Sequence, residues 1–202
     1  MPRSPEANEK LRDESRSRIL SASLRLFAEL GYERATIKAI AAEAGISQGL
    51  IYAHFTSKAE LLGAIFAESM ADVRASFAAA EAADSPSARI EGLLRASFEI
   101  LRRNADFWRL SYSLRMQPGV LQELGSGLDD WTQSILDTLE GFLRDAGSRD
   151  PAVDAELLFA LIDGLSQHYV LDPDGFPLEA CIERAVDFYR ALPTCPKRRM
   201  PA

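Results

Sequence analysis

Cysteine is scarce in this chain of 202 residues, which contains only Cys181 and Cys195. Two thiols are too few for a disulfide-stapled scaffold, and their spacing matches no metal-binding motif. We therefore expect two buried or incidental thiols in a reducing cytoplasm and no metal site. No run of eighteen apolar residues occurs, and the first sixteen residues lack the apolar core of a secretory signal. These absences predict a cytoplasmic protein without a membrane-spanning helix.

Motifs for catalysis and for cofactor binding are also missing. The chain contains no phosphate-binding loop, no serine-nucleophile elbow, no HExxH zinc motif and no dinucleotide fingerprint. Its carboxylates are distributed among arginines in the way expected for solvated helix faces. The chain is therefore predicted not to be an enzyme and to require no cofactor.

Strict alternation of apolar and polar residues is absent as well, which predicts that no β-sheet forms. Apolar residues instead recur at intervals of three and four, which predicts an all-α fold of about nine helices. In the long seventh helix, Gly125 and Gly127 weaken the start, which allows either a kink or a late onset. The expected helices are 13–30, 37–44, 48–55, 58–83, 87–103, 106–116, 120–145, 151–171 and 178–192.

The net charge of −7 taken alone argues against a nucleic-acid partner. The charge is unevenly distributed, however. Residues 1–60 hold nine Lys/Arg and eight Asp/Glu, whereas residues 61–202 hold fourteen and twenty-two. Because phosphate binding depends on a local cluster of donors rather than on the net charge, the N-terminal part remains a candidate for DNA binding.

Residues 36–58, TIKAIAAEAGISQGLIYAHFTSK, predict two short helices joined by a tight turn. Thr36 and Ser47 are the predicted N-caps, because a hydroxyl can accept a hydrogen bond from a free amide of the first turn. Gly45 ends the first helix, since glycine takes the left-handed conformation at little steric cost. This layout is typical of a helix-turn-helix, whose second helix enters the major groove of DNA.

A capping box, Ser57 to Glu60, opens the next helix and so predicts a helical connection between this region and the rest of the chain. We expect a DNA-binding domain at residues 1–57, in which residues 1–12 are disordered. A helical ligand-binding and dimerisation domain is expected at 58–192, followed by a mobile tail at 193–202.

The segment 27–62, FAELGYERATIKAIAAEAGISQGLIYAHFTSKAELL, resembles the N-terminal signature of the TetR family of transcriptional regulators. The close resemblance is confined to this part, and the remainder matches in layout, with DGL at 163–165 and LDPDGF at 171–176 similar to the last two helices of such regulators. The matching residues stand in order at fixed spacing: Phe27, Gly31, Thr36, Ile40, Ala41, Gly45, Ser47, Gly49, Ile51, Tyr52, His54, Phe55, Lys58 and Leu61.

The resemblance implies a homodimer whose subunits each have a three-helix DNA-binding head and a larger helical body. It further implies repression at a palindromic operator in double-stranded DNA, released by a small hydrophobic or amphipathic effector. Carried over by position, the DNA contacts fall on Thr36, Lys38, Ser47, Gln48, Gly49, Leu50, Tyr52, His54 and Lys58.

The start of the second helix of the motif carries the candidate base contacts. Gln48 can donate to and accept from the edge of adenine, and Gly49 permits close approach. Leu50 either packs on a thymine methyl group or belongs to the core.

The remaining contacts are candidates for the DNA backbone, and Lys38 matches a position at which family members contact either the backbone or a base. Lys58 resembles the phosphate-binding lysine of the family. Tyr52 and His54 lie towards phosphate or pack on the head. The hydroxyls of Thr36 and Ser47 can serve phosphate, but they are caps whether or not DNA is present.

For the body, the resemblance implies a small-molecule site and an interface formed by the last two helices. Aromatic residues at helical spacing also fit an ordinary core, and His168 could face either the pocket or the subunit seam. The pocket candidates are Phe98, Trp108, Tyr112, Trp131, Phe159 and His168, chosen among aromatic residues and those with a polar group that needs a partner. The interface candidates are Leu161, Leu165, Cys181, Ile182 and Tyr189.

Two other functions remain open beside the repressor. A helical ligand-binding or interaction module with a vestigial head would fail to shift its own promoter DNA at low salt. An enzyme would show turnover or retain a cofactor on purification.

Overall fold

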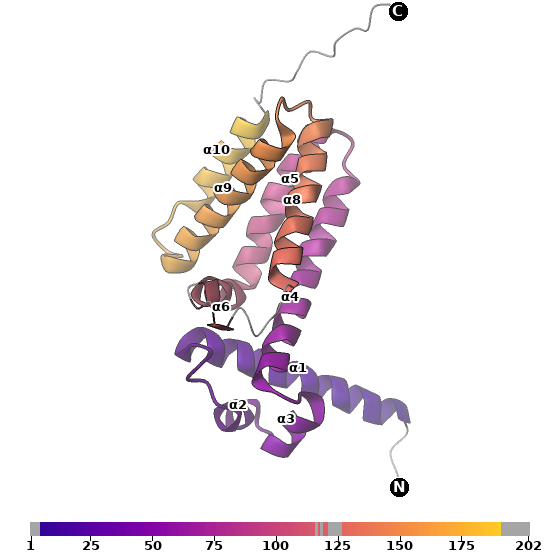
Figure 1. The fold of residues 1–202 in the computed structure, drawn as a ribbon, viewed down its shortest axis with the longest axis vertical. Coiled ribbons are helices and arrows are strands. Elements are labelled where there is room, and N and C mark those ends of the chain that lie inside the picture. The colour runs from indigo at the N-terminus through magenta and orange to yellow at the C-terminus, as the bar shows by residue number, and fades with distance from the viewer. Residues whose placement is uncertain (1–4, 116, 118, 121–126, 191–202) are drawn as a thin grey trace, which may run out of the picture. The chain divides into compact units, whose positions relative to one another are not determined.

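The computed structural model describes residues 5–115, 117, 119–120 and 127–190. Within these ranges the chain is helical apart from short connections, and no strand occurs, as the all-α prediction requires (Figure 1). The helices are α1 (Pro5–Leu30), α2 (Ile37–Ala44), α3 (Gln48–His54), α4 (Lys58–Glu81), α5 (Pro86–Arg103), α6 (Ala105–Arg115), α8 (Gly127–Asp145), α9 (Pro151–Leu171) and α10 (Leu178–Arg190).

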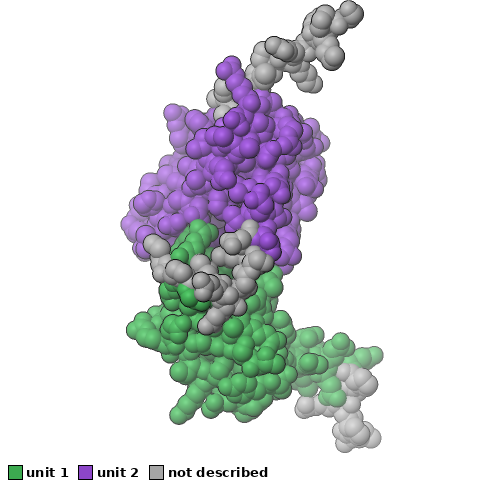
Figure 2. All heavy atoms as spheres, viewed as in Figure 1, with its two compact units in different colours: residues 1–70, 109–125 green, residues 71–108, 126–202 purple. Residues whose placement is uncertain are grey.

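The chain forms two compact units (Figure 2). Unit one comprises Met1–Met70 and Arg109–Gly125, and unit two comprises Ala71–Trp108 and Ser126–Ala202. The boundary differs from the expected one after residue 57, because the first half of α4 belongs to the N-terminal unit. Its apolar residues Leu61, Leu62 and Ile65 are buried there.

Helix α1 is longer than the sequence predicts. It begins at Pro5, so the expected disorder of residues 1–12 is wrong for residues 5–12, while residues 1–4 lie outside the described residues. Proline suits the first helical turn, and the glutamates, lysine and arginines that follow are good helix formers even when they are fully solvated. The helix ends at Leu30, and the next residue, Gly31, has a left-handed φ of 82°.

The predicted caps of α2 and α3 are confirmed. The Thr36 hydroxyl accepts from the Ala39 amide at 3.1 Å, and the Ser47 hydroxyl accepts from the Leu50 amide at 3.2 Å. Gly45 ends α2 with a φ of 65°. These local hydrogen bonds fix the corner between the two helices, and Ile51 is fully buried beneath it.

The start of α4 departs slightly from a standard capping box. Ser57 accepts from the Glu60 amide at 3.0 Å, as predicted. The Glu60 carboxylate, however, accepts from both the amide and the hydroxyl of Thr56, each at 2.6 Å, rather than from the Ser57 amide. These hydrogen bonds lower the pKa of Glu60.

In unit two, α5, α8, α9 and α10 pack against one another (Figure 1). Helix α8 packs on α9, and α10 packs on α5. The predicted helix 120–145 is described as α8 from Gly127 onwards, and residues 121–126 lie outside the described residues, as does the expected tail at 193–202. The buried side of α10 consists of Leu178, Ile182, Ala185, Val186 and Tyr189.

Candidate nucleic-acid interface

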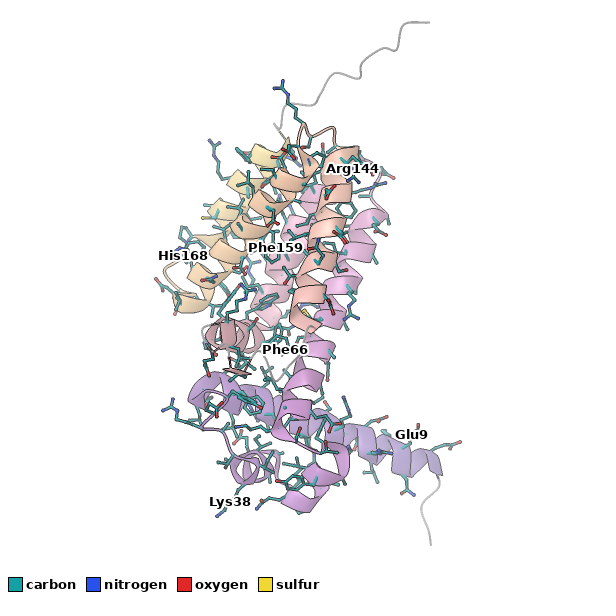
Figure 3. The ribbon with its side chains drawn as sticks, in the orientation of Figure 1. Glu9, Lys38, Phe66, Arg144, Phe159 and His168 are labelled. Atoms are coloured by element: carbon teal, nitrogen blue, oxygen red, sulfur yellow. The ribbon has the colours of Figure 1, made fainter. Side chains whose placement is uncertain are left out.

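One side of the α2–α3 pair is exposed to solvent and carries most of the predicted DNA contacts. Lys38 extends from α2 at the edge of the head (Figure 3). Tyr52 of α3 is 56% exposed, so it does not pack in the core. Leu50 and His54 are half-buried, whereas Thr36, Lys38, Ser47, Gln48, Gly49 and Tyr52 are exposed.

Gly49 is not required by the fold. It lacks a positive φ, and a Cβ placed on it would meet only the Ser47 hydroxyl oxygen at 3.9 Å, which is an ordinary contact. A side chain would therefore fit in the free protein, in contrast to Gly45, which needs its left-handed φ. The absence of a side chain at position 49 leaves the backbone of α3 accessible from outside.

The end of α3 lies beside the N-terminal half of α1. Arg16 lies over the Phe55 ring at 5.5 Å from its centroid and pairs with Glu68 at 3.8 Å. Burial lowers the pKa of His54, and the charges of Arg12 and Arg16 lower it further, while Asp13 opposes them. The neighbourhood of these arginines and α3 could not be predicted from the sequence, because it depends on how α1 packs against α3 and, for Arg12, on a helix that begins at Pro5.

The Lys58 ammonium is bound within unit one. It donates to the carbonyl of Tyr32 at 2.8 Å, of Glu33 at 3.3 Å and of Ala35 at 3.4 Å. It also lies 4.3 Å from the centroid of the Tyr32 ring. In the protein without DNA the ammonium is thus hydrogen-bonded to the connection between α1 and α2, and the phosphate contact of Lys58 stays a prediction.

The six pocket candidates do not share one environment. Phe98 is fully buried in unit two and is a core residue. His168 is exposed and stacks on Phe176, with ring centroids 5.6 Å apart, so it does not line an enclosed pocket (Figure 3). The other four are half-buried: Trp108, Tyr112, Trp131 and Phe159.

The indole N–H of Trp131 is buried and has no hydrogen-bond partner among the described residues. A cleft of about 610 Å³ opens elsewhere on unit two, between the end of α4, the start of α5 and the second half of α8. Its walls are largely polar, with Arg89 bound to Asp145 at 3.1 Å. None of the six pocket candidates lines this cleft.

Two of the interface candidates on α10 are buried inside the protomer and are not exposed to a second subunit. Ile182 is 2% exposed and Tyr189 is 6% exposed within a single protomer, because the apolar side of α10 packs on α5. Ion pairs from Arg95 to Glu183 and from Arg102 to Glu179 flank that contact. The half-buried candidates are Leu161, Leu165 and Cys181.

The apolar side chains that unit two leaves exposed lie on the other side of these helices. Leu157 of α9 is 58% exposed and Phe188 of α10 is 60% exposed. Val153 and Leu171 of α9 are exposed as well. Helix α9 therefore has apolar residues on its packed side and on its solvent side.

Other kinds of site find no support in the described part of the chain. It contains no group of three or more metal-ligating side chains. None of its helices is both long and apolar enough to cross a membrane.

Comparison with known proteins identifies the fold of both units. The family model for bacterial regulatory proteins of the tetR family matches residues 19–65, which contain the helix-turn-helix. The model for the tetracyclin repressor-like C-terminal domain matches residues 84–189, more than half of the chain. The chain belongs to the TetR family of transcriptional regulators. It is therefore a DNA-binding regulator and not an enzyme.

Individual TetR-family relatives match over most of their length. The HTH-type transcriptional regulator TtgR of Pseudomonas putida is 30% identical over 187 residues, which covers 86% of this chain and 89% of that protein. The HTH-type transcriptional regulator BetI 1 of Chromohalobacter salexigens is 28% identical over 178 residues, covering 86% of this chain and 87% of that protein.

Solved structures of other proteins have the same fold as this chain. A transcriptional regulator from Rhodococcus sp. Rha1 superposes with a TM-score of 0.74 at 21% identity, covering 86% of this chain and 92% of that one. FadR from Bacillus subtilis, solved in complex with stearoyl-CoA, superposes with a TM-score of 0.73 at 17% identity, covering 87% of this chain and 97% of that one. At such identities the likeness bears on the fold alone.

Proposed function

We propose that this TetR-family regulator is a homodimeric repressor that binds a palindromic operator and is released by a small hydrophobic or amphipathic effector. The observation that carries the proposal is the exposed start of α3, where Gln48 and Gly49 face solvent on a helix held by two caps. A dimer with two-fold symmetry presents two such helices and so reads two inverted half-sites.

In this proposal Gln48 reads a base edge, while Lys38 and the capped helix starts at Thr36 and Ser47 hold phosphates. The head thus separates sequence readout from backbone attachment. That separation can be tested, because base contacts alter sequence preference and phosphate contacts alter the salt dependence of binding.

The first experiment measures binding to DNA from the regulator's own promoter region, over a series of salt concentrations. Gln48→Ala is expected to relax sequence preference and to leave the salt slope unchanged. Lys38→Ala is expected to weaken binding to all sequences and to reduce the salt slope by about 0.9. If the wild-type protein binds no DNA at low salt, the repressor proposal fails and a module with a vestigial head takes its place.

The proposed dimer interface is the solvent side of α9, with Phe188 of α10, rather than the buried residues Ile182 and Tyr189. Val153 and Leu157 lie one turn apart on this side, and a second copy would remove them from water. Leu157→Asp is therefore expected to give monomers with an intact helical fold. Sedimentation velocity and circular dichroism measure both properties, and a dimer that persists in this variant would exclude α9 from the interface.

The proposed effector site lies in the body, with Trp131 as its most specific candidate. A buried indole N–H without a partner costs about 1–3 kcal/mol, and a ligand with a hydrogen-bond acceptor would remove that cost. The chain has two tryptophans, so Trp131→Phe leaves Trp108 as the single fluorescent reporter.

A panel of amphipathic probes, stearoyl-CoA among them, tests this site by tryptophan fluorescence and by operator binding. An effector is expected to change fluorescence and to weaken operator binding in the wild type, with lower affinity for Trp131→Phe. A probe that binds the body without changing operator affinity would contradict release by an effector, since coupling requires both sites to respond.

A further inference from the structure

Ion pairs join α5 to α10 along one edge of the contact between these helices. The pairs are Arg102 with Glu179, Arg95 with Glu183, and Arg190 with Glu91. As the residue number rises along α10, that of the partner falls along α5. The two helices therefore run antiparallel, and all three pairs follow one register.

Arg95 connects two of these pairs into a network. Its two terminal nitrogens donate to the two carboxylate oxygens of Glu183 at 2.9 and 3.3 Å, and its Nε donates to Glu91 at 3.0 Å. Glu91 in turn accepts from Arg190. The hydrogen bonds from Arg95 lower the pKa of Glu91 and of Glu183. A two-pronged contact between arginine and carboxylate fixes orientation as well as distance.

The network lies beside the apolar side of α10. Glu179, Glu183 and Arg190 recur at i, i+4 and i+11, which places them on one flank of the helix. All three are exposed, so each pair contributes little to stability by itself. The apolar side supplies the stabilisation, but apolar contact is non-directional and does not fix how far one helix slides along the other.

A slide of α10 by one turn would bring like charges together. In one direction, Glu183 would leave Arg95 and reach Glu91, which lies four residues earlier in α5. In the other direction, Arg190 would leave Glu91 and reach Arg95. Because like charges repel, the observed register is favoured over both of its neighbours.

We propose that the charges on α5 and α10 select the register of α10 within the protomer and thereby hold Phe188 in place for a second copy. Phe188 lies on the other flank of α10 and is 60% exposed. A slide of one turn would move it by about 5.4 Å along the helix axis. This consequence for Phe188 rests on the proposed dimer interface, whereas the register itself does not.

Two exchanges of charge test the register without altering the net charge. Glu91→Arg with Arg95→Glu inverts the α5 side, and Glu183→Arg with Arg190→Glu inverts the α10 side. Each double variant places like charges across the contact and keeps opposite charges at positions 91 and 95. The quadruple variant combines the two exchanges and restores opposite charges across the contact.

Hydrogen exchange followed by mass spectrometry reports on α10 directly. Amides of α10 are expected to exchange about tenfold faster in both double variants than in the wild type, and to return to within about threefold of it in the quadruple variant. The difference should shrink in about 1 M salt, which screens exposed pairs. Wild-type exchange in the double variants, or additive losses in the quadruple variant, would overturn the proposal.

Arg184→Asp with Asp187→Arg is the matched control. It exchanges two charges on the solvent side of the same helix, where both residues are exposed. Exchange of α10 is expected to stay at the wild-type rate. Acceleration equal to that of the double variants would mean that α10 responds to any exchange of charge, which contradicts selection of a register by specific pairs.

Sedimentation of the same proteins tests the consequence for Phe188. Both double variants are expected to weaken dimerisation about tenfold, and the quadruple variant to recover it. Unchanged dimerisation in double variants whose α10 exchanges faster would overturn the link between the register and Phe188. A monomeric wild type would instead remove the proposed dimer, and hydrogen exchange would still decide whether the charges select the register.

Discussion

The helix-turn-helix of unit one and the α9–α10 pair of unit two differ in what holds each together. In the helix-turn-helix, caps at Thr36 and Ser47 and a glycine at position 45 set the geometry within a few residues. In the α9–α10 pair, the arrangement depends on which apolar side of each helix meets which neighbour. Local hydrogen bonding therefore sets the geometry of a helix and its turn, whereas packing determines which neighbour the helix contacts.

Helix α10 illustrates the second case. Its single apolar side fits either a dimer interface or the protomer's own core, and the structure uses it for contact with α5. Helix α9 is apolar on two sides, so its periodicity does not indicate which side faces inward. The buried positions are Ala155, Leu158, Ser166 and Val170, while the predicted Leu161 and Leu165 are only half-buried.

The largest expected effect is the difference in stability between two charged substitutions on opposite sides of α10. Ile182→Asp should destabilise the fold by more than about 3 kcal/mol, because it removes a buried side chain and buries a carboxylate without a partner. Phe188→Asp, on the exposed side of the same helix, should preserve stability to within about 1 kcal/mol and weaken the proposed dimer. Urea unfolding and sedimentation measure the pair. Equal stability of the two variants would contradict the assignment of the two sides.

Substitution of two glycines in the helix-turn-helix is expected to have an intermediate effect. It distinguishes a glycine that folding requires from one that DNA binding requires. Gly45→Ala should cost about 1 kcal/mol of stability, because alanine is strained at a φ of 65°. Gly49→Ala should leave stability unchanged or raise it by up to about 1 kcal/mol, since alanine favours the helix and its methyl group fits.

Operator binding completes this comparison of the two glycines. Gly49→Ala should reduce operator affinity about tenfold, because in the proposed complex the added methyl would lie where DNA approaches α3. Thermal unfolding and fluorescence anisotropy supply the two measurements. Unchanged affinity in Gly49→Ala would place the start of α3 away from the DNA.

The smallest expected effect is a pH dependence of operator binding through His54. In the free protein burial, Arg12 and Arg16 lower the pKa of His54 below 6.5. A nearby phosphate would raise that pKa, so the regulator takes up a proton on binding and its affinity rises several-fold at most as the pH falls from 7.5 to about 6. His54→Gln should flatten this dependence, and an identical pH profile in both proteins would exclude a phosphate next to His54.

The folding stability of the free regulator should decrease as the pH falls, whereas operator affinity is expected to rise. Because the folded protein disfavours protonated His54, the unfolded chain takes up the proton first as the pH falls. The contribution of His54 to stability is therefore present above a pH of about 6.5 and is lost as the pH decreases through the lowered pKa. Urea unfolding of the wild type and of His54→Gln measures this difference.

The sequence alone predicted the all-α architecture, the helix-turn-helix and its caps, and the position of most helices. It did so because capping, glycine conformations and apolar periodicity depend on residues close together in the chain. Helix α9, for example, has the predicted bounds of 151–171. The family resemblance extended this local information to a DNA-binding function, which the comparisons then established.

Tertiary packing set the partner of each side chain. It assigned the apolar side of α10 to α5, placed Arg12 and Arg16 beside His54, and bound Lys58 to carbonyls more than twenty residues earlier in the chain. Such contacts follow from the packing of whole helices, which the adjacent sequence does not specify. Helix α3 could be predicted from the sequence, whereas the contacts that hold α3 in place are seen only in the folded structure.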